Sequence, residues 1–246
     1  MDQPDAFFRR RGVCGGGAGG YFHKGWRAAG FDQISIRQDH HPLGDLPASV
    51  GDFRVVHTCH SRWRRTGVWL RLFEALAQDA DNEYVMIDAT IVRAHQHSTG
   101  VKGGDPDSQA IGCSKGGLST KIHATVDALG NPIGFFLTAG QARDLRGANV
   151  VLKDTSAQSV VADKAYDAHD RLIGPLLDKG KTVVIPSRST NKQQSEYDRD
   201  LYKARHPIEN FFARLKQYRG IATRYDKTAC NFLRSIHLAA SMVWLV

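Results

Sequence analysis

The segment that most limits the possible folds of this chain is EYVMIDATIV at residues 83–92, which has the length and composition of a buried β-strand. Asp88 lies in its middle with apolar residues on both sides. An isolated carboxylate in such surroundings is unfavourable unless it is paired with a cation or coordinates a metal. The alternative is that Asp88 accepts hydrogen bonds from the backbone or from an arginine, for instance Arg93. The segment therefore predicts a sheet that contains either a structural or a functional carboxylate.

The elements that follow this strand indicate an α/β fold. Two strands joined by a turn with Gly130 and Asn131 should pair antiparallel. We predict strands at residues 118–128 and 133–140, a helix at 142–153, a strand at 159–163, a helix at 168–179, a strand at 182–186, and helices at 202–216 and 231–244. Together they predict a mixed sheet flanked by helices.

A second carboxylate, Asp163, ends the short buried strand at residues 159–163, where the chain turns toward a helix. Open α/β folds bind ligands at the carboxyl ends of their strands. The alternative is that Asp163 caps the helix, although Asp167 is better placed for that role.

A third carboxylate lies on the helix predicted at residues 202–216, YKARHPIENFFARLK. At about 100° per residue, polar residues fall within an arc of roughly 60°: Tyr202, Arg205, Glu209 and Lys216. Apolar residues fill the neighbouring arc, namely Leu201, Ala204, Ile208, Phe211, Phe212 and Leu215. A carboxylate beside two cations suits metal binding with phosphate contacts. The alternative is an amphipathic surface helix with Arg205 and Glu209 as an i,i+4 pair.

Pro207 complicates this helix, because proline lacks an N–H and clashes with a preceding helical turn. The helix can begin near Pro207 or bend there, which would move Tyr202 and Arg205 off the predicted arc.

These carboxylates can form one site. The strands with Asp88 and Asp163 can be neighbours, and Glu209 on a covering helix can complete a triad. Three oxygen ligands with open positions suit Mg²⁺. Two such ions about 3.5–4 Å apart can activate a water or hydroxyl and stabilise the leaving oxygen in phosphodiester displacement.

The charge distribution favours a polyanionic partner such as DNA. The formal net charge is +8, and residues 199–227 contain eight Lys and Arg against three Asp and Glu. Two short helices are predicted from residue 51, broken at Thr66 and Gly67, with Arg62, Arg64 and Arg65 between the apolar positions. These arginines could lie against DNA, or the helices could cap the next domain. The alternative for the whole excess is a basic protein whose charges keep it dispersed.

Several other classes of protein are not indicated. Four distant cysteines, Cys14, Cys59, Cys113 and Cys230, contain no CxxC pair, so neither a disulfide framework nor a zinc ribbon is predicted. His95 and His97 could ligate a metal or be solvated in a loop. The apolar run at residues 238–246 is too short to cross a bilayer. The expected location is therefore the cytoplasm.

The motifs as a set resemble a known family. The order Asp88, Asp163, Glu209 and the spacing Tyr202-x2-Arg205-x3-Glu209-x6-Lys216 closely resemble the DDE transposases of bacterial insertion sequences, specifically the insertion sequence 5-like group. Matching phrases are YVMIDATIVRAHQHS, GGLSTKIHATVDALGNP, VVADKAYD and ATRYDKTACNFL. The resemblance spans residue 45 to the C-terminus.

The resemblance implies a ribonuclease H-like catalytic core. It also implies nicking at the terminal inverted repeats of the element, then attack of the exposed 3′-hydroxyl on target DNA. Asp88, Asp163 and Glu209 would be catalytic and would hold Mg²⁺ or Mn²⁺, as two ions. Arg205 and Lys216 would contact phosphate, and Tyr202 would support the site. The protein would act as a homo-oligomer on DNA in the bacterial nucleoid.

Three regions are predicted. Residues 1–40 form a disordered or non-native Gly-rich arm, since they show no apolar periodicity; residues 41–80 are the remnant of a helical N-terminal region; residues 81–246 are the catalytic domain. Relatives carry a helical DNA-binding region before the segment that matches GDLPASVGDFR, so a frameshifted or truncated reading frame is a hypothesis for the unusual start. Two other functions stay open: a catalytically silent DNA-binding remnant that interferes with the intact enzyme, and a stand-alone nuclease.

Overall fold

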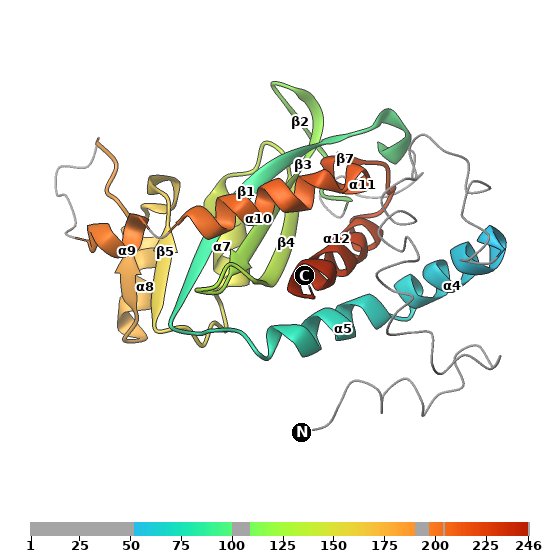
Figure 1. Cartoon of the computed structure of the whole chain (residues 1–246). Helices are drawn as coiled ribbons and strands as arrows, with labels where there is room; N and C mark the ends of the chain where they lie inside the picture. Colours follow the sequence, from blue (N-terminus) through green and yellow to red (C-terminus); the bar gives the residue numbers. More distant parts are fainter. Residues whose placement is uncertain (1–51, 100–108, 190–196, 204, 246) are drawn as a thin grey trace.

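The computed structural model describes residues 52–99, 109–189, 197–203 and 205–245 (Figure 1). The predicted Gly-rich arm at residues 1–40 lies outside the described residues, as does the start of the predicted helical remnant.

Within the described residues, seven strands form one mixed sheet. They are β1 (Tyr84–Ala94), β2 (Gly112–Ser114), β3 (Gly117–Val126), β4 (Pro132–Ala139), β5 (Ser159–Ala162), β6 (Thr182–Val184) and β7 (Thr223–Arg224). β1 is central: it pairs antiparallel with β3 and parallel with β5 and β7. β3 pairs antiparallel with β2 and β4, while β5 pairs parallel with β6. The prediction of a mixed sheet is confirmed, as is the predicted hairpin of β3 and β4.

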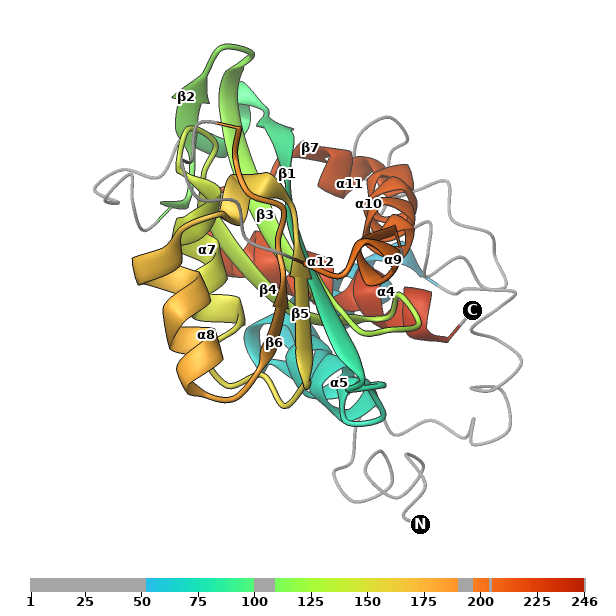
Figure 2. The same ribbon diagram turned by 90° about the vertical axis from the view of Figure 1, so that its left-hand side faces the viewer.

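Helices cover both faces of this sheet (Figure 2). The helices are α4 (Phe53–Arg65), α5 (Val68–Ala77), α7 (Asp144–Val151), α8 (Gly174–Asp178), α9 (Arg199–Lys203), α10 (His206–Gln217), α11 (Arg219–Ala222) and α12 (Ala229–Trp244). Short 3₁₀ turns occur at Gln96–Thr99 and Lys164–Tyr166, and a π-helical turn at His169–Ile173 precedes α8. α7 and α8 lie on one face, and α10 and α12 on the other. The fold is therefore the mixed α/β architecture, a sheet flanked by helices, that the sequence predicts.

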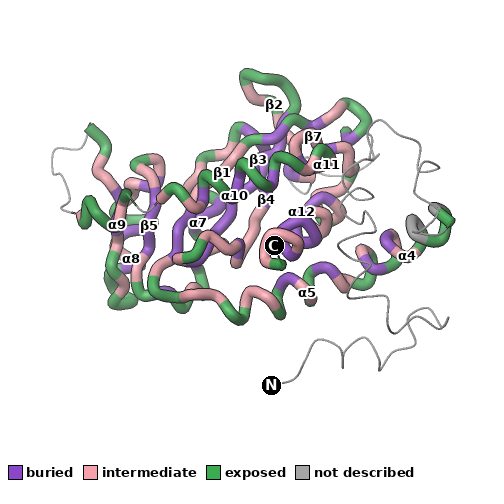
Figure 3. The backbone as a smooth tube through the Cα atoms, viewed as in Figure 1, coloured by how far each residue is buried: buried purple, intermediate pink, exposed green. Residues whose placement is uncertain are grey.

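The alternation of side chains along β1 divides the core into two clusters, one on each face. Met86 packs with Phe211 of α10 and Phe232 of α12, whereas Ile87 packs with Leu172 on the α8 side. Figure 3 marks the buried segments of the sheet and its helices in purple. Because Asp88 lies two residues after Met86, its side chain belongs to the α10 face.

The two helices predicted before the sheet are confirmed. α4 ends at Arg65, and Gly67 is the N-cap of α5 with φ of 71°, a left-handed conformation that glycine adopts without strain. Trp63 and Trp69 pack with Leu238 of α12, so α5 lies alongside the last helix (Figure 1). No helix in the described ranges has both the length and the apolar composition needed to span a bilayer.

The single helix predicted at residues 202–216 is wrong, and the interruption considered at Pro207 is what occurs. α9 ends at Lys203, and α10 begins at His206 with Pro207 in its first turn. Proline is tolerated there because the first N–H groups of a helix have no intrahelical partner. Tyr202 and Arg205 therefore do not share a helical face with Glu209.

Candidate active site

Strand register brings Asp88 and Asp163 together. β1 and β5 are parallel, and Ile87 is the partner of Ala162 in their last pair. Asp88 and Asp163 each follow this pair by one residue. Both therefore leave the sheet at the same level and on the same face, the one covered by α10. The sequence predicted that these two strands can be neighbours, and the register confirms it.

Arg205 connects these two carboxylates to the third. Its Nη2 atom lies 3.2 Å from Asp88 Oδ2 and 3.1 Å from Glu209 Oε1. Its Nη1 atom lies 3.4 Å from Asp163 Oδ1. Since two oxygens on one nitrogen cannot be farther apart than the sum of their distances to it, Asp88 and Glu209 are close neighbours. One guanidinium thus touches all three predicted acids.

The solvent exposure of the site side chains increases from Arg205 to Glu209. The exposed fraction of the side chain is 16% for Arg205 and 23% for Asp88, 35% for Asp163 and 55% for Glu209. Burial raises the pKa of Asp88, and the neighbouring Asp163 and Asp144 act in the same direction, against the Ala89 N–H and Arg205. Ionised Asp88 is therefore the least favourable of these charges to keep buried without a cation.

Arg205 responds to the same charges. Its burial alone would lower its pKa, but the carboxylates of Asp88, Asp163 and Glu209 outweigh burial and, with Tyr202, raise the pKa above its ordinary value. The guanidinium stays fully charged. Three carboxylates against this one cation leave a formal excess of two negative charges at the site.

Two further groups hold Asp163. The Tyr202 hydroxyl donates to Asp163 Oδ1 at 3.4 Å, so this tyrosine reaches the site from α9 although the helix is interrupted. The same oxygen accepts from the Lys164 backbone N–H at 2.7 Å. Asp163 therefore caps the 3₁₀ turn, whereas the carboxylate of Asp167 accepts from the Arg188 N–H. The expectation that Asp167 is the better cap was wrong, because the chain forms a 3₁₀ turn directly after β5.

Sequence reasoning missed Arg188. Its side chain donates from Nε to the Lys164 carbonyl at 3.0 Å and from Nη2 to the Ala165 carbonyl at 2.7 Å. It thereby ties the turn after Asp163 to the segment after β6. Nothing in the polar stretch that begins at Ser187 distinguishes this arginine in the sequence.

The donor set suits a divalent ion in its chemistry. Carboxylate oxygens are the ligands that Mg²⁺ and Mn²⁺ prefer, and the excess negative charge at the site would favour cation binding. In the described part of the chain, however, no group of three or more His, Cys, Asp and Glu side chains is arranged to hold a metal. The guanidinium lies among the three carboxylates and contacts the oxygens that an ion would need.

His95 and His97 were considered as a separate metal pair. Their rings lie edge to face, with centroids 4.7 Å apart. The His95 ring also stacks on Tyr225 at 4.7 Å, with 22° between the ring planes. The pair is thus part of an aromatic contact between the end of β1 and the segment after β7.

The residues predicted to contact DNA fall into two groups. Lys216 is exposed on α10, about two turns beyond Glu209 on the same side, and Arg62 and Arg65 are exposed on α4. Arg64 differs: it forms an ion pair with Asp226, and only 14% of its side chain is exposed. The structure places Arg64 against the segment after β7 instead of on the open face of its helix.

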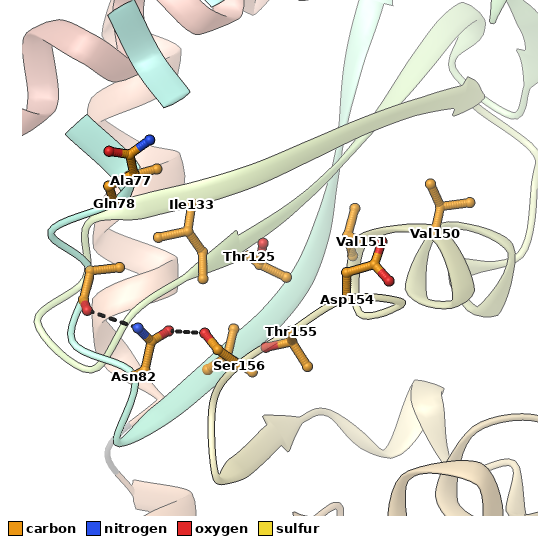
Figure 4. Close-up of a pocket in the computed structure, with 12 residues that line it drawn as sticks. Ala77, Gln78, Asn82, Thr125, Ile133, Val150, Val151, Asp154, Thr155 and Ser156 are labelled. Atoms are coloured by element: carbon orange, nitrogen blue, oxygen red, sulfur yellow. Dashed lines mark hydrogen bonds between the residues drawn. The ribbon is translucent and has the colours of Figure 1, made fainter. Parts of the chain in front are cut away.

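A pocket of about 410 Å³ lies away from these acids, beside the start of β1 (Figure 4). Its wall includes Asn82, whose amide oxygen accepts from the Ser156 hydroxyl at 2.7 Å. Its lining residues come from α5 and the segment before β1, from strands β1, β3 and β4, and from α7 and the segment after it: Ala77, Gln78, Ala80, Asn82, Val85, Thr125, Ile133, Val150, Val151, Asp154, Thr155 and Ser156. None of the predicted site residues is among them.

Comparisons with known proteins agree with this geometry. The chain is 41% identical over 130 residues to a candidate transposase for insertion sequence element IS6501 of Brucella ovis, a match that covers 52% of this chain and 99% of the relative. It is 44% identical over 75 residues to the uncharacterized protein y4sN of Sinorhizobium fredii, covering 29% of this chain and 60% of that protein.

Among solved structures, the chain is similar to the Mos1 strand transfer complex, with 12% identity and a TM-score of 0.28. It is similar to the Mos1 mariner paired end complex with Mn at 13% identity and the same TM-score, and each match covers 87% of this chain and 75% of the other.

The family comparison covers most of the chain. A family described as Transposase DDE domain matches residues 80–244, from just before β1 to the end of α12. This range includes all three acids and Arg205. The chain therefore belongs to the Transposase DDE domain family and is a DDE-type insertion-sequence transposase.

Proposed function

We propose that this transposase cleaves DNA strands at the ends of its insertion sequence and joins the resulting 3′-hydroxyl to target DNA, with Asp88, Asp163 and Glu209 as its catalytic acids. The observation that carries the proposal is the convergence of all three carboxylates on one guanidinium, from two adjacent strands and a covering helix. A cluster of carboxylates with an uncompensated negative charge does not stabilise the fold, so a purely structural role does not explain why these three meet.

Each residue has a distinct task. The three acids would hold divalent ions, Mg²⁺ or Mn²⁺, which when bound activate the attacking oxygen and stabilise the leaving one. Tyr202 orients Asp163 through its hydroxyl. Arg205 and Lys216 would contact the phosphates of DNA, because both are cations on the α10 side of the acids.

The test is a cleavage and joining assay. Purified protein is incubated with Mg²⁺ or Mn²⁺, DNA that carries the terminal repeats, and a target plasmid. We expect nicked ends and strand-transfer products. Asp88→Asn, Asp163→Asn and Glu209→Gln should each lower cleavage by at least about a thousandfold, since an active site that acts as a unit fails when one member is lost. Folding of each variant is checked by its thermal transition.

Glu74→Gln is the matched control, because Glu74 is an exposed acid on α5, outside the site. It should cleave like the wild type. Cleavage retained by any of the three site variants overturns the role of that residue. Binding of end DNA without nicking would favour a catalytically silent remnant, and nicks without joined products would favour a stand-alone nuclease.

A further inference from the structure

Arg205 uses the same oxygens that the proposed ions need. We propose that Arg205 is the resident counter-ion of the metal-free transposase, and that metal loading displaces its guanidinium from the three carboxylates toward the DNA phosphates. This inference rests on the proposed function and adds an order of events: Arg205 is first held by the acids, and it becomes available to DNA only when ions take them over.

The hydrogen bonds of Asp88 support this exchange. Its Oδ1 atom accepts from the Ala89 N–H at 2.8 Å, and its Oδ2 atom accepts from Arg205 Nη2 at 3.2 Å. Both oxygens of the most buried of the three acids are thus engaged, one by a backbone N–H and the other by Arg205. An ion at Asp88 therefore competes with Arg205 directly.

The other two acids offer the same competition. Asp163 Oδ1 receives the Lys164 N–H and the Tyr202 hydroxyl in addition to Arg205, and Glu209 contacts Arg205 through Oε1. Arg205 touches all three acids, so one movement of its side chain would release the oxygen that it contacts on each of them.

The position of Arg205 permits that movement. It lies at the N-cap of α10, outside the hydrogen-bonded body of the helix, and its side chain reaches the acids through four rotatable bonds. Because arginine stays protonated, the released guanidinium keeps its charge and can bind a phosphate in bidentate fashion. Partly exposed ion pairs are individually weak, so this exchange is energetically accessible.

The experiment measures Mn²⁺ binding to DNA-free protein by the electron paramagnetic resonance signal of free Mn²⁺. Arg205→Gln removes the competing cation. We expect its dissociation constant for Mn²⁺ to fall about tenfold, the sum of several weak ion pairs. Arg205→Lys keeps one charge but cannot bridge three acids, so its affinity should lie between the wild type and Arg205→Gln. It also tests the proposal should Arg205→Gln fail to fold.

Arg64→Gln is the matched control. Arg64 is also ion-paired, 14% of its side chain is exposed against 16% for Arg205, and its loss changes the net charge by the same amount. Its Mn²⁺ affinity should equal that of the wild type. An equal gain in Arg64→Gln would show that only net charge matters and would overturn the proposal.

Asp88→Asn distinguishes a failure of the Arg205 exchange from a failure of the proposed carboxylate site. If Asp88→Asn abolishes Mn²⁺ binding but Arg205→Gln does not strengthen it, the exchange is wrong and the catalytic assignment stands. If Asp88→Asn leaves Mn²⁺ binding unchanged in both the wild-type and the Arg205→Gln background, the carboxylate site fails, and the exchange fails with it.

Discussion

Two arginines of this transposase, one half-buried and one fully buried, have opposite roles. Arg205 donates to side chains that carry charge: three carboxylates, on β1, directly after β5 and on α10, surround it. Arg224, on β7, is fully buried and donates mainly to neutral oxygens. Its Nη1 atom bonds the Thr120 hydroxyl at 2.7 Å and the Ala110 carbonyl at 3.3 Å, and its Nε atom bonds the Asp226 carbonyl at 3.0 Å.

The charge balance of the two centres differs as well. Three acids surround the single cation Arg205, so the acids exceed the cations by two. At the other centre, Asp226 pairs with Arg64 and lies near Arg224, so two cations face one acid. Burial lowers the pKa of Arg224 to about 10, against the opposing effect of Asp226. Arg224 also lies over the Phe232 ring at 5.1 Å. It thus joins the sheet to α12 and, through Asp226, to α4.

The acceptors of the two side chains distinguish a structural arginine from a functional one. Backbone and hydroxyl acceptors from several elements fix Arg224 in one position, so its role is to hold the fold together. The acceptors of Arg205 are ionised oxygens with an unbalanced charge, an arrangement that is useful only if another cation arrives.

The largest expected effect that tests this contrast is on stability. Arg224→Met should lower the free energy of unfolding by about 3 kcal/mol, because it removes a buried cation and leaves the Thr120 hydroxyl oxygen and the Asp226 carbonyl without their donor groups. Arg205→Met should lower it by no more than about 1 kcal/mol. Solvent screens the partly exposed Asp163 and Glu209, and Asp88, whose pKa burial already raises, can take up a proton. Urea unfolding monitored by circular dichroism compares the two variants.

Equal losses in the two variants would break the contrast, because Arg205 would then be as structural as Arg224. A matched control is Arg171→Met, which removes an exposed arginine of the π-helical turn before α8. It should leave the unfolding free energy within about 0.5 kcal/mol of the wild type.

A smaller effect is expected from Arg188, which combines features of both arginines. It bonds backbone carbonyls as Arg224 does, but those carbonyls belong to the turn directly after Asp163. We expect Arg188→Ala to lower the cleavage rate about tenfold at limiting Mn²⁺, because a misplaced ligand weakens both metal binding and reaction geometry. The measurement is the cleavage rate as a function of Mn²⁺ concentration.

A role in positioning Asp163 has a specific signature. Raising the Mn²⁺ concentration should recover part of the activity of Arg188→Ala, and Arg188→Lys should restore part of it at low Mn²⁺, because lysine can still reach one carbonyl. A loss of activity that is the same at every Mn²⁺ concentration, together with a lowered thermal transition, would show that Arg188 serves only the fold.

Much of the fold follows from the sequence, because hydrophobic pattern and turn residues fix local structure. EYVMIDATIV forms β1, the Gly130 turn joins β3 to β4, and Gly67 separates α4 from α5 as predicted. The short strands β2 and β7 and the 3₁₀ turn after Asp163 were not predicted, since they depend on pairing with β3 and β1 and on tethering by Arg188.

The sequence indicated candidates for the site but not their arrangement. The resemblance to DDE transposases pointed to Asp88, Asp163 and Glu209, and Asp88 was also marked by its apolar surroundings. Helical spacing wrongly placed Arg205 and Tyr202 beside Glu209 on one helix, because Pro207 starts a new one. Arg205 still reaches Glu209, but from the N-cap, where its side chain can turn toward the sheet and meet Asp88 and Asp163 as well.

The smallest expected effect concerns Lys216, which is exposed, unlike Arg205 and Arg224. Its ammonium is exposed on α10 and forms no ion pair with any residue in the described ranges. A cation without an acidic partner is free to contact phosphate, so Lys216→Gln should weaken binding of end DNA a few-fold and reduce the slope of log affinity against log salt by about 1. Fluorescence anisotropy at several salt concentrations measures both. Lys153→Gln removes an exposed lysine after α7, on the other face of the sheet, and should leave the slope unchanged. If the two variants reduce the slope equally, DNA responds only to the overall positive charge, and α10 has no special part in holding it.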